Sequence, residues 1–228
     1  PCTDDGEELP LHGTLSHIPA TLRGIDETAD ALTVSLRIVD AALFGRKLVL
    51  DRVYRFSYTA NIFSVTDTVT NAADTVSPYM VLYHCNMGYP LLSENSTVYI
   101  PNSGITPRNA HAAKYMDTAL QMEVPQAGYE ECCYYFDVTA DNGVAKAGIY
   151  NDTIHKGVVL SYNKSQLPYF TEWKMMGDTD YVLGLEPGNC TPDGRDVLRQ
   201  NGTLQFLQPD ESKVTAVQFA FIDKKEEF

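Results

Sequence analysis

The sequence has no long apolar run and little positive charge. No stretch approaches the roughly 20 apolar residues that a membrane-spanning helix requires, so nothing in it predicts a membrane span. Lys and Arg number 17 against 30 Asp and Glu, which gives a formal net charge of −13. Because like charges repel, this balance argues against nucleic acids and anionic membranes as partners. It is compatible with a small neutral ligand.

Cysteine is scarce, and its pattern is not that of a disulfide framework or a zinc site. The five cysteines are odd in number, and a bond between the adjacent Cys132 and Cys133 would close a strained ring. No CxxC or Cys/His spacing indicates zinc. We therefore expect buried, reduced thiols in a cytoplasmic protein.

The common catalytic motifs are absent as well. The sequence has no Gly-rich phosphate loop, no GxSxG nucleophile elbow and no HExxH zinc motif. These absences argue against the common nucleotide-binding enzymes, serine hydrolases and zinc proteases. We expect neither a metal nor another cofactor.

Alternating apolar and polar residues dominate what is present. This period of two predicts half-buried strands, and the predicted strands span 31–39, 48–59, 61–71, 79–84, 97–100, 132–139, 145–150, 157–162, 169–175, 181–185 and 214–222. Asn142-Gly143 between two such runs predicts a hairpin. Turns recur every eight to twelve residues, as in β-sandwiches and barrels. Helices are predicted only at 110–119 and 195–200, and one antiparallel all-β domain over 1–228 is the simplest interpretation.

Three polar residues lie in apolar or turn-forming surroundings. His12 precedes Gly13, His84 ends the run 80–84, and Glu186 follows the apolar stretch 181–185 before Pro187-Gly188. A lone buried carboxylate costs several kcal/mol, so Glu186 is expected to have a partner or a catalytic role unless it lies exposed at the end of its strand. Two imidazoles and a carboxylate suit acid–base chemistry near neutral pH. Each taken alone also has a structural explanation, as a core, edge or loop residue.

Trp173, the only tryptophan, is flanked by Glu172 and Lys174. An aromatic ring beside charged groups is typical of sugar stacking and equally typical of a core anchor.

Several segments together resemble the galactose mutarotase-like superfamily of aldose 1-epimerases, and most closely a bacterial branch described as a domain of unknown function. They are Leu11-His12-Gly13 with Pro19-Ala20, the run 83–92 (YHCNMGYPLL), and the segments 172–174 and 181–189 (YVLGLEPGN). The resemblance runs in order through essentially the whole chain. It implies a large antiparallel β-sandwich with an open sugar cleft and with further strands ahead of the His-Gly segment. We therefore expect residues before Pro1 to be missing from this chain.

The resemblance also implies roles for individual residues. Glu186 matches the carboxylate that takes the proton of the anomeric hydroxyl, His84 the histidine that protonates the ring oxygen, and His12 a second histidine that polarises the same region. The Asp that grips the sugar in the family has no clear equivalent, and Glu131 is the nearest match. Asn86, Trp173 and Lys174 are the other expected cleft residues.

These observations leave two classes of function open. The first is a mutarotase-like isomerase that interconverts the anomers of a free hexose or related sugar. The second is a carbohydrate-binding β-sandwich that keeps the cleft without catalysis. A sugar acid or sugar phosphate is a further ligand class, for which Lys174 would be the cation. The partners expected are a small-molecule sugar and further copies of the chain itself, in a homo-oligomer.

Overall fold

The computed structural model describes residues 1–228, which fold into strands with only short helices between them. The chain divides into two compact units. Unit 1 comprises 1–81 and 192–217, and unit 2 comprises 82–191 and 218–228. The single domain that the sequence predicts over 1–228 stays a prediction. No helix is both long and apolar enough to cross a membrane.

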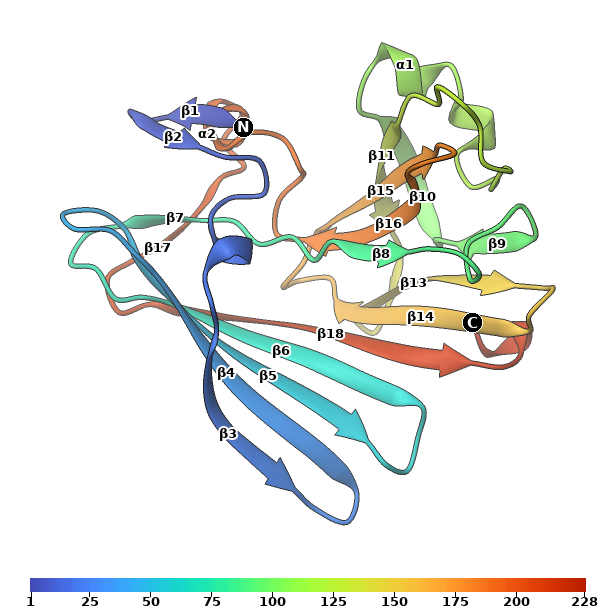
Figure 1. Ribbon diagram of the computed structural model, residues 1–228. Coiled ribbons are helices and arrows are strands. Elements are labelled where there is room, and N and C mark those ends of the chain that lie inside the picture. Colours follow the sequence, from blue (N-terminus) through green and yellow to red (C-terminus); the bar gives the residue numbers. More distant parts are fainter. The chain divides into compact units, whose positions relative to one another are not determined.

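Unit 1 is built on long antiparallel strands (Figure 1). Their order is β18-β6-β5-β4-β3, and the shared strand β18 contributes its first residues here. The strands of this unit are β1 (Cys2–Asp4), β2 (Glu7–Leu9), β3 (Thr21–Glu27), β4 (Ala31–Ala41), β5 (Lys47–Ser57), β6 (Ile62–Asn71), β7 (Ser77–Tyr79), β17 (Gln205–Leu207) and β18 (Ser212–Ile222). Its helices are η1 (Leu15–His17) and α2 (Arg195–Gln200).

Burial in unit 1 follows the alternation in the sequence. In β6 every second residue from Val65 to Asn71 is buried, as the period of two requires. A core cluster joins Leu50, Val69, Tyr79 and Leu207. The one buried carboxylate of β6, Asp67, accepts two hydrogen bonds of 2.7 and 2.6 Å from Arg52 of β5, so its charge is paired.

Unit 2 contains a five-stranded antiparallel sheet in the order β10-β11-β15-β16-β8 (Figure 1). A second set of strands, β12, β13 and β14, pairs beside it in sequence order, and β9 pairs with β13. The strands are β8 (Cys85–Met87), β9 (Ser96–Tyr99), β10 (Asn102–Pro107), β11 (Cys132–Val138), β12 (Ala140–Asp141), β13 (Val144–Asn151), β14 (Lys156–Asn163), β15 (Tyr169–Met176) and β16 (Tyr181–Gly188). The helices are α1 (Ala110–Ala113), η2 (Met116–Thr118) and η3 (Lys225–Glu227).

The sequence predicted most of the longer strands, but it missed β3 and β10 and misjudged three further segments. The Asn142-Gly143 hairpin is confirmed, since both residues have positive φ (49° and 82°) and Asp141 pairs with Val144. The strand predicted at 79–84 is wrong, because β7 ends at Tyr79 and β8 begins at Cys85. The helix predicted at 110–119 is a four-residue helix followed by a 3₁₀ turn. Strand β16 continues through Glu186 to Gly188 and does not end before it.

Candidate functional site

The register of three neighbouring strands brings polar residues to one face of the sheet in unit 2. Strand β16 pairs with β8, with Gly184 opposite Asn86, and with β15, with Gly184 opposite Trp173. Beyond β8 the same register continues to a bridge between Leu82 and Gly188, which places His84 opposite Glu186. Because side chains alternate along a strand, His84, Asn86, Trp173 and Glu186 all project from this face.

His84 and Glu186 are in direct contact across these strands. The ring nitrogen Nε2 of His84 lies 3.1 Å from Oε1 of Glu186. Oε1 of Glu186 has no hydrogen-bond partner, so the two groups lie close together without a hydrogen bond between them. The side chain of His84 is 31% exposed, whereas that of Glu186 is 2% exposed. A partly exposed imidazole therefore lies against a buried carboxyl group.

Two further side chains hold the imidazole of His84. Its Nδ1 lies 2.7 Å from the side-chain oxygen Oδ1 of Asn86, two residues along the chain. The ring of Trp173 meets it edge-on, with 5.3 Å between the ring centroids and an interplanar angle of 73°. The ring of His84 is thus fixed by contacts on its two nitrogens and on its edge.

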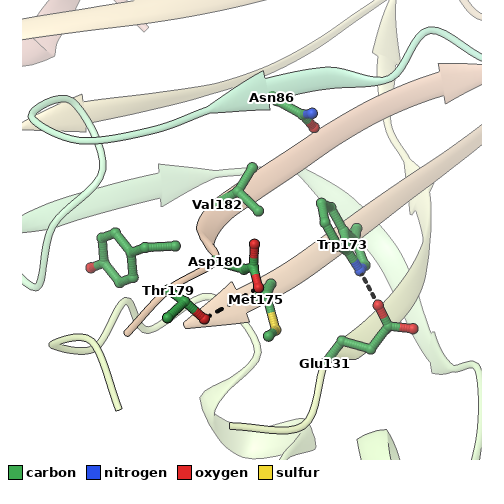
Figure 2. Close-up of a pocket in the computed structure, with 8 residues that line it drawn as sticks. Asn86, Glu131, Trp173, Met175, Thr179, Asp180 and Val182 are labelled. Carbon is green, nitrogen blue, oxygen red and sulfur yellow. Dashed lines mark hydrogen bonds between the residues drawn. The ribbon is translucent and has the colours of Figure 1, made fainter. Parts of the chain in front are cut away.

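Trp173 is itself anchored by Glu131. Its indole Nε1 donates a 2.6 Å hydrogen bond to Oε2 of Glu131, which precedes β11 (Figure 2). Both residues line an open cavity of about 570 Å³, together with Asn86, Met175, Thr179, Asp180, Tyr181 and Val182. His84 and Glu186 are not among the lining residues, but His84 contacts two that are, Asn86 and Trp173.

Burial governs the electrostatics of Glu186. Removal from water raises the pKa of its carboxyl group to about 8, with Arg108 lowering the pKa and Glu131 raising it. Close to neutral pH, Glu186 therefore exchanges a proton readily. A carboxyl group of this kind beside an imidazole can take a proton from one oxygen of a ligand while the imidazole gives a proton to another.

Lys174 lies elsewhere than we expected. It is next to Trp173 in β15, so its side chain projects from the opposite face of the sheet and is 2% exposed. Its Nζ donates hydrogen bonds to the backbone oxygens of Thr118 and Gln121 and to Glu123 Oε1, at 3.2, 2.6 and 2.9 Å. The ammonium group stabilises the segment after α1, and it does not face the cavity. Our interpretation of Lys174 as a ligand for the sugar is corrected accordingly.

His12 belongs to unit 1, whereas the other site residues belong to unit 2. It lies before η1 with φ of 65°, is exposed, and is followed by Gly13 with φ of 68°. The role that the resemblance implies for His12 stays a prediction.

Two functional neighbours were missed in the sequence. Gly184 lies between Trp173 and Asn86, and Glu186 Oε1 occupies the space that a β-carbon at residue 184 would fill. Arg108, which follows β10, acts on the pKa of Glu186. The spacings Gly-x-Glu and His-x-Asn were readable as same-face pairs on two strands. Nothing in the sequence pattern indicated that Arg108 would approach them.

Comparison with known proteins places the chain in a family. A family model described as a domain of unknown function, DUF4432, matches residues 1–221. The chain belongs to this family. No curated protein matches the DUF4432 chain significantly.

Solved structures share the fold of this DUF4432 chain. A Klebsiella pneumoniae protein, provisionally described as an aldose 1-epimerase, matches 100% of the chain with a TM-score of 0.93 and 26% identity. The chain spans 61% of that protein's length. A galactose mutarotase-like protein from Clostridium acetobutylicum matches 93% of the chain over 69% of its own length, with a TM-score of 0.69 and 16% identity. An Escherichia coli K12 protein, also provisionally described as an aldose 1-epimerase, matches 89% of the chain over 68% of its own length, with a TM-score of 0.60 and 15% identity. The fold is therefore the galactose mutarotase-like, antiparallel β-sandwich fold that the sequence predicted.

Proposed function

We propose that the chain is an aldose 1-epimerase-like isomerase, which interconverts the anomers of a free hexose or related sugar. The contact of 3.1 Å between His84 Nε2 and Glu186 Oε1 carries this proposal. It joins a proton acceptor and a proton donor on one face of a sheet, beside a cavity lined by the single tryptophan. The provisional descriptions of the Klebsiella and Escherichia proteins support the same reaction.

In the proposed reaction, ionised Glu186 takes the proton of the anomeric hydroxyl while protonated His84 gives its Nε2 proton to the ring oxygen. The bond between C1 and the ring oxygen breaks, and the aldehyde rotates about the C1–C2 bond. Ring closure then returns both protons, in the reverse direction, and leaves the other anomer. Each positioned group could contribute roughly 10²- to 10⁴-fold, and no net proton is gained or lost.

The remaining expected residues take supporting places. Trp173, held by Glu131, offers its ring to the carbon–hydrogen face of a sugar. Asn86 lines the cavity and can donate from its amide nitrogen. The role of His12 as a second histidine that polarises the sugar stays a prediction. A cytoplasmic location and assembly into a homo-oligomer stay predictions.

Proton NMR of anomer exchange tests the proposal. A panel of hexoses and hexuronic acids is equilibrated with the native protein, with Glu186→Gln and, as a control, with Glu130→Gln, whose side chain is 67% exposed. We expect at least one sugar to interconvert faster than its spontaneous rate with the native and control proteins only. If no sugar is accelerated while one still changes the fluorescence of Trp173, the chain is a carbohydrate-binding protein without catalysis.

A further inference from the structure

The two ring nitrogens of His84 have different partners. Nδ1 lies 2.7 Å from Asn86 Oδ1, and Nε2 lies 3.1 Å from Glu186 Oε1. A side-chain carbonyl oxygen can only accept a hydrogen bond, so the short contact to Asn86 requires the proton on Nδ1. In the neutral ring, the lone pair is then on Nε2 and faces Glu186.

We propose that Asn86 is a positioning residue, whose side-chain carbonyl holds His84 in the Nδ1–H tautomer with Nε2 directed at Glu186. This inference rests on the proposed isomerase function for its catalytic consequence. Its structural content, the tautomer of His84, can be measured without any sugar.

The surroundings of Asn86 are suited to this role. Asn86 lies opposite Gly184, which has no side chain to compete for the space above the strand. The ring of Trp173 packs against the imidazole in an edge-to-face arrangement. Asn86 and His84 are two residues apart at the edge strand, so one backbone segment fixes the separation of both groups. The amide therefore holds the ring through a short, local contact.

An uncharged partner has a chemical consequence for the pair. Asn86 cannot take up the proton that it binds on Nδ1, so Nε2 is the nitrogen at which the imidazole exchanges a proton with a ligand. The proposed reaction needs one proton on the His84–Glu186 pair both before and after ring opening. The charged groups that act on Glu186 are Arg108, after β10, and Glu131, before β11. Cys133 and Tyr135 of β11 lie on the same face of the sheet.

Two-bond ¹H–¹⁵N NMR of the imidazoles gives the direct test. The protein contains five histidines, and the spectrum of His84→Gln assigns the signals of His84 by their loss. In the sugar-free native protein we expect the neutral ring of His84 to be the Nδ1–H tautomer. Asn86→Leu should give a mixture of tautomers. A neutral His84 that carries its proton on Nε2 in the native protein overturns the proposal, whether or not the protein is an isomerase.

Kinetics then separate positioning from sugar binding. Asn86→Leu should lower kcat for anomer exchange by about 10²-fold, with a much smaller change in KM, because the proton-transfer step is impaired. Asn86→Asp also accepts from Nδ1, so it should keep the Nδ1–H tautomer and shift the pH profile to higher pH through its negative charge. If Asn86→Leu does not fold, the Asn86→Asp variant alone still tests the positioning role. A change confined to KM in both variants would assign Asn86 to sugar binding alone and overturn the positioning role.

Discussion

The carboxyl group of Glu186 lies against the backbone of Gly184, in the space that a side chain at residue 184 would fill. The two residues are separated by one position in β16 and therefore share a face of the sheet. Glycine is needed here because Glu186 approaches the backbone closely. Its conformational freedom is not used, since its φ is not positive and the strand makes no turn. In this position, Oε1 of Glu186 lies 3.1 Å from Nε2 of His84.

Substitution of Gly184 by alanine is expected to displace the carboxyl group of Glu186 without unfolding the sheet. The new β-carbon would meet the far end of a flexible side chain, and Trp173 Cβ at 3.2 Å would have to move by a few tenths of an ångström. A displacement of about 1 Å in a catalytic group can cost about 10²-fold in rate. We therefore expect Gly184→Ala to reduce anomer exchange by about this factor with little change in melting temperature.

Gly104→Ala is the matched control, because a β-carbon there would meet no atom within 4 Å and its φ is not positive. It should leave both the rate and the melting temperature close to those of the native protein. An unchanged rate in Gly184→Ala would mean that the observed position of Glu186 is not the one used in catalysis.

The rate of anomer exchange should depend on pH through Glu186. Burial raises the pKa of its carboxyl group to about 8, and a general base must be ionised to accept a proton. The value of kcat/KM is therefore expected to be low at pH 5, where Glu186 is protonated, to rise toward neutral pH, and to fall again at higher pH, where the His84–Glu186 pair loses the proton that the reaction needs. Measurement between pH 5 and 9, with the spontaneous rate subtracted, tests this. A rate that does not rise between pH 5 and 7 would contradict the burial argument, because a carboxyl group with its ordinary pKa of about 4.5 is already ionised throughout that range.

The part of the site that could be predicted from the sequence is the part that strand pattern and same-face spacing reveal. His84 and Glu186 stood out because each interrupts an apolar run, and the structure brings them together. Lys174 was misplaced because adjacency to Trp173 in a strand means opposite faces, and the burial of a lysine could not be foreseen without its partners. Arg108 approaches through a pairing of distant segments that the sequence pattern does not encode.

Glu172 should make the stability of the protein fall as the pH rises from about 4.5 to about 8. Its side chain is fully buried, neither carboxyl oxygen has a hydrogen-bond partner, and desolvation raises its pKa to about 8. The folded state therefore holds this proton more tightly than the unfolded state, whose pKa is about 4.5. Its contribution to stability is fully present below pH 4.5 and is lost as the pH rises to about 8, by up to about 1.4 kcal/mol per pH unit.

Glu172→Gln removes this ionisation while keeping the size of the side chain. Relative to the native protein, the variant is expected to gain stability between pH 5 and 9, as measured by urea unfolding at each pH. The exposed Glu130→Gln should show no such trend. A constant difference between Glu172→Gln and the native protein at every pH would show that Glu172 does not titrate in this range.

Asn151 is expected to be the main polar anchor of the segment that follows β8. Its side chain is 1% exposed, and Nδ2 lies within 3.2 Å of the oxygens of Pro90, Leu91, Ser93 and Ser96. Its Oδ1 accepts hydrogen bonds from the backbone nitrogens after β13, at 2.8 and 3.2 Å.

Removal of this amide leaves several buried groups without partners, at about 1–3 kcal/mol for each unsatisfied group. Asn151→Ala should therefore lower the free energy of unfolding by about 2–4 kcal/mol, measured by urea titration. Asn163→Ala is the comparison, because Asn163 is exposed at the end of β14 and its Oδ1 bonds only to Ser165. Equal losses in the two variants would mean that the buried contacts of Asn151 add nothing to those of an ordinary turn asparagine. We expect the larger loss for Asn151→Ala, because its amide bonds to groups of a segment that lies far from it in the sequence.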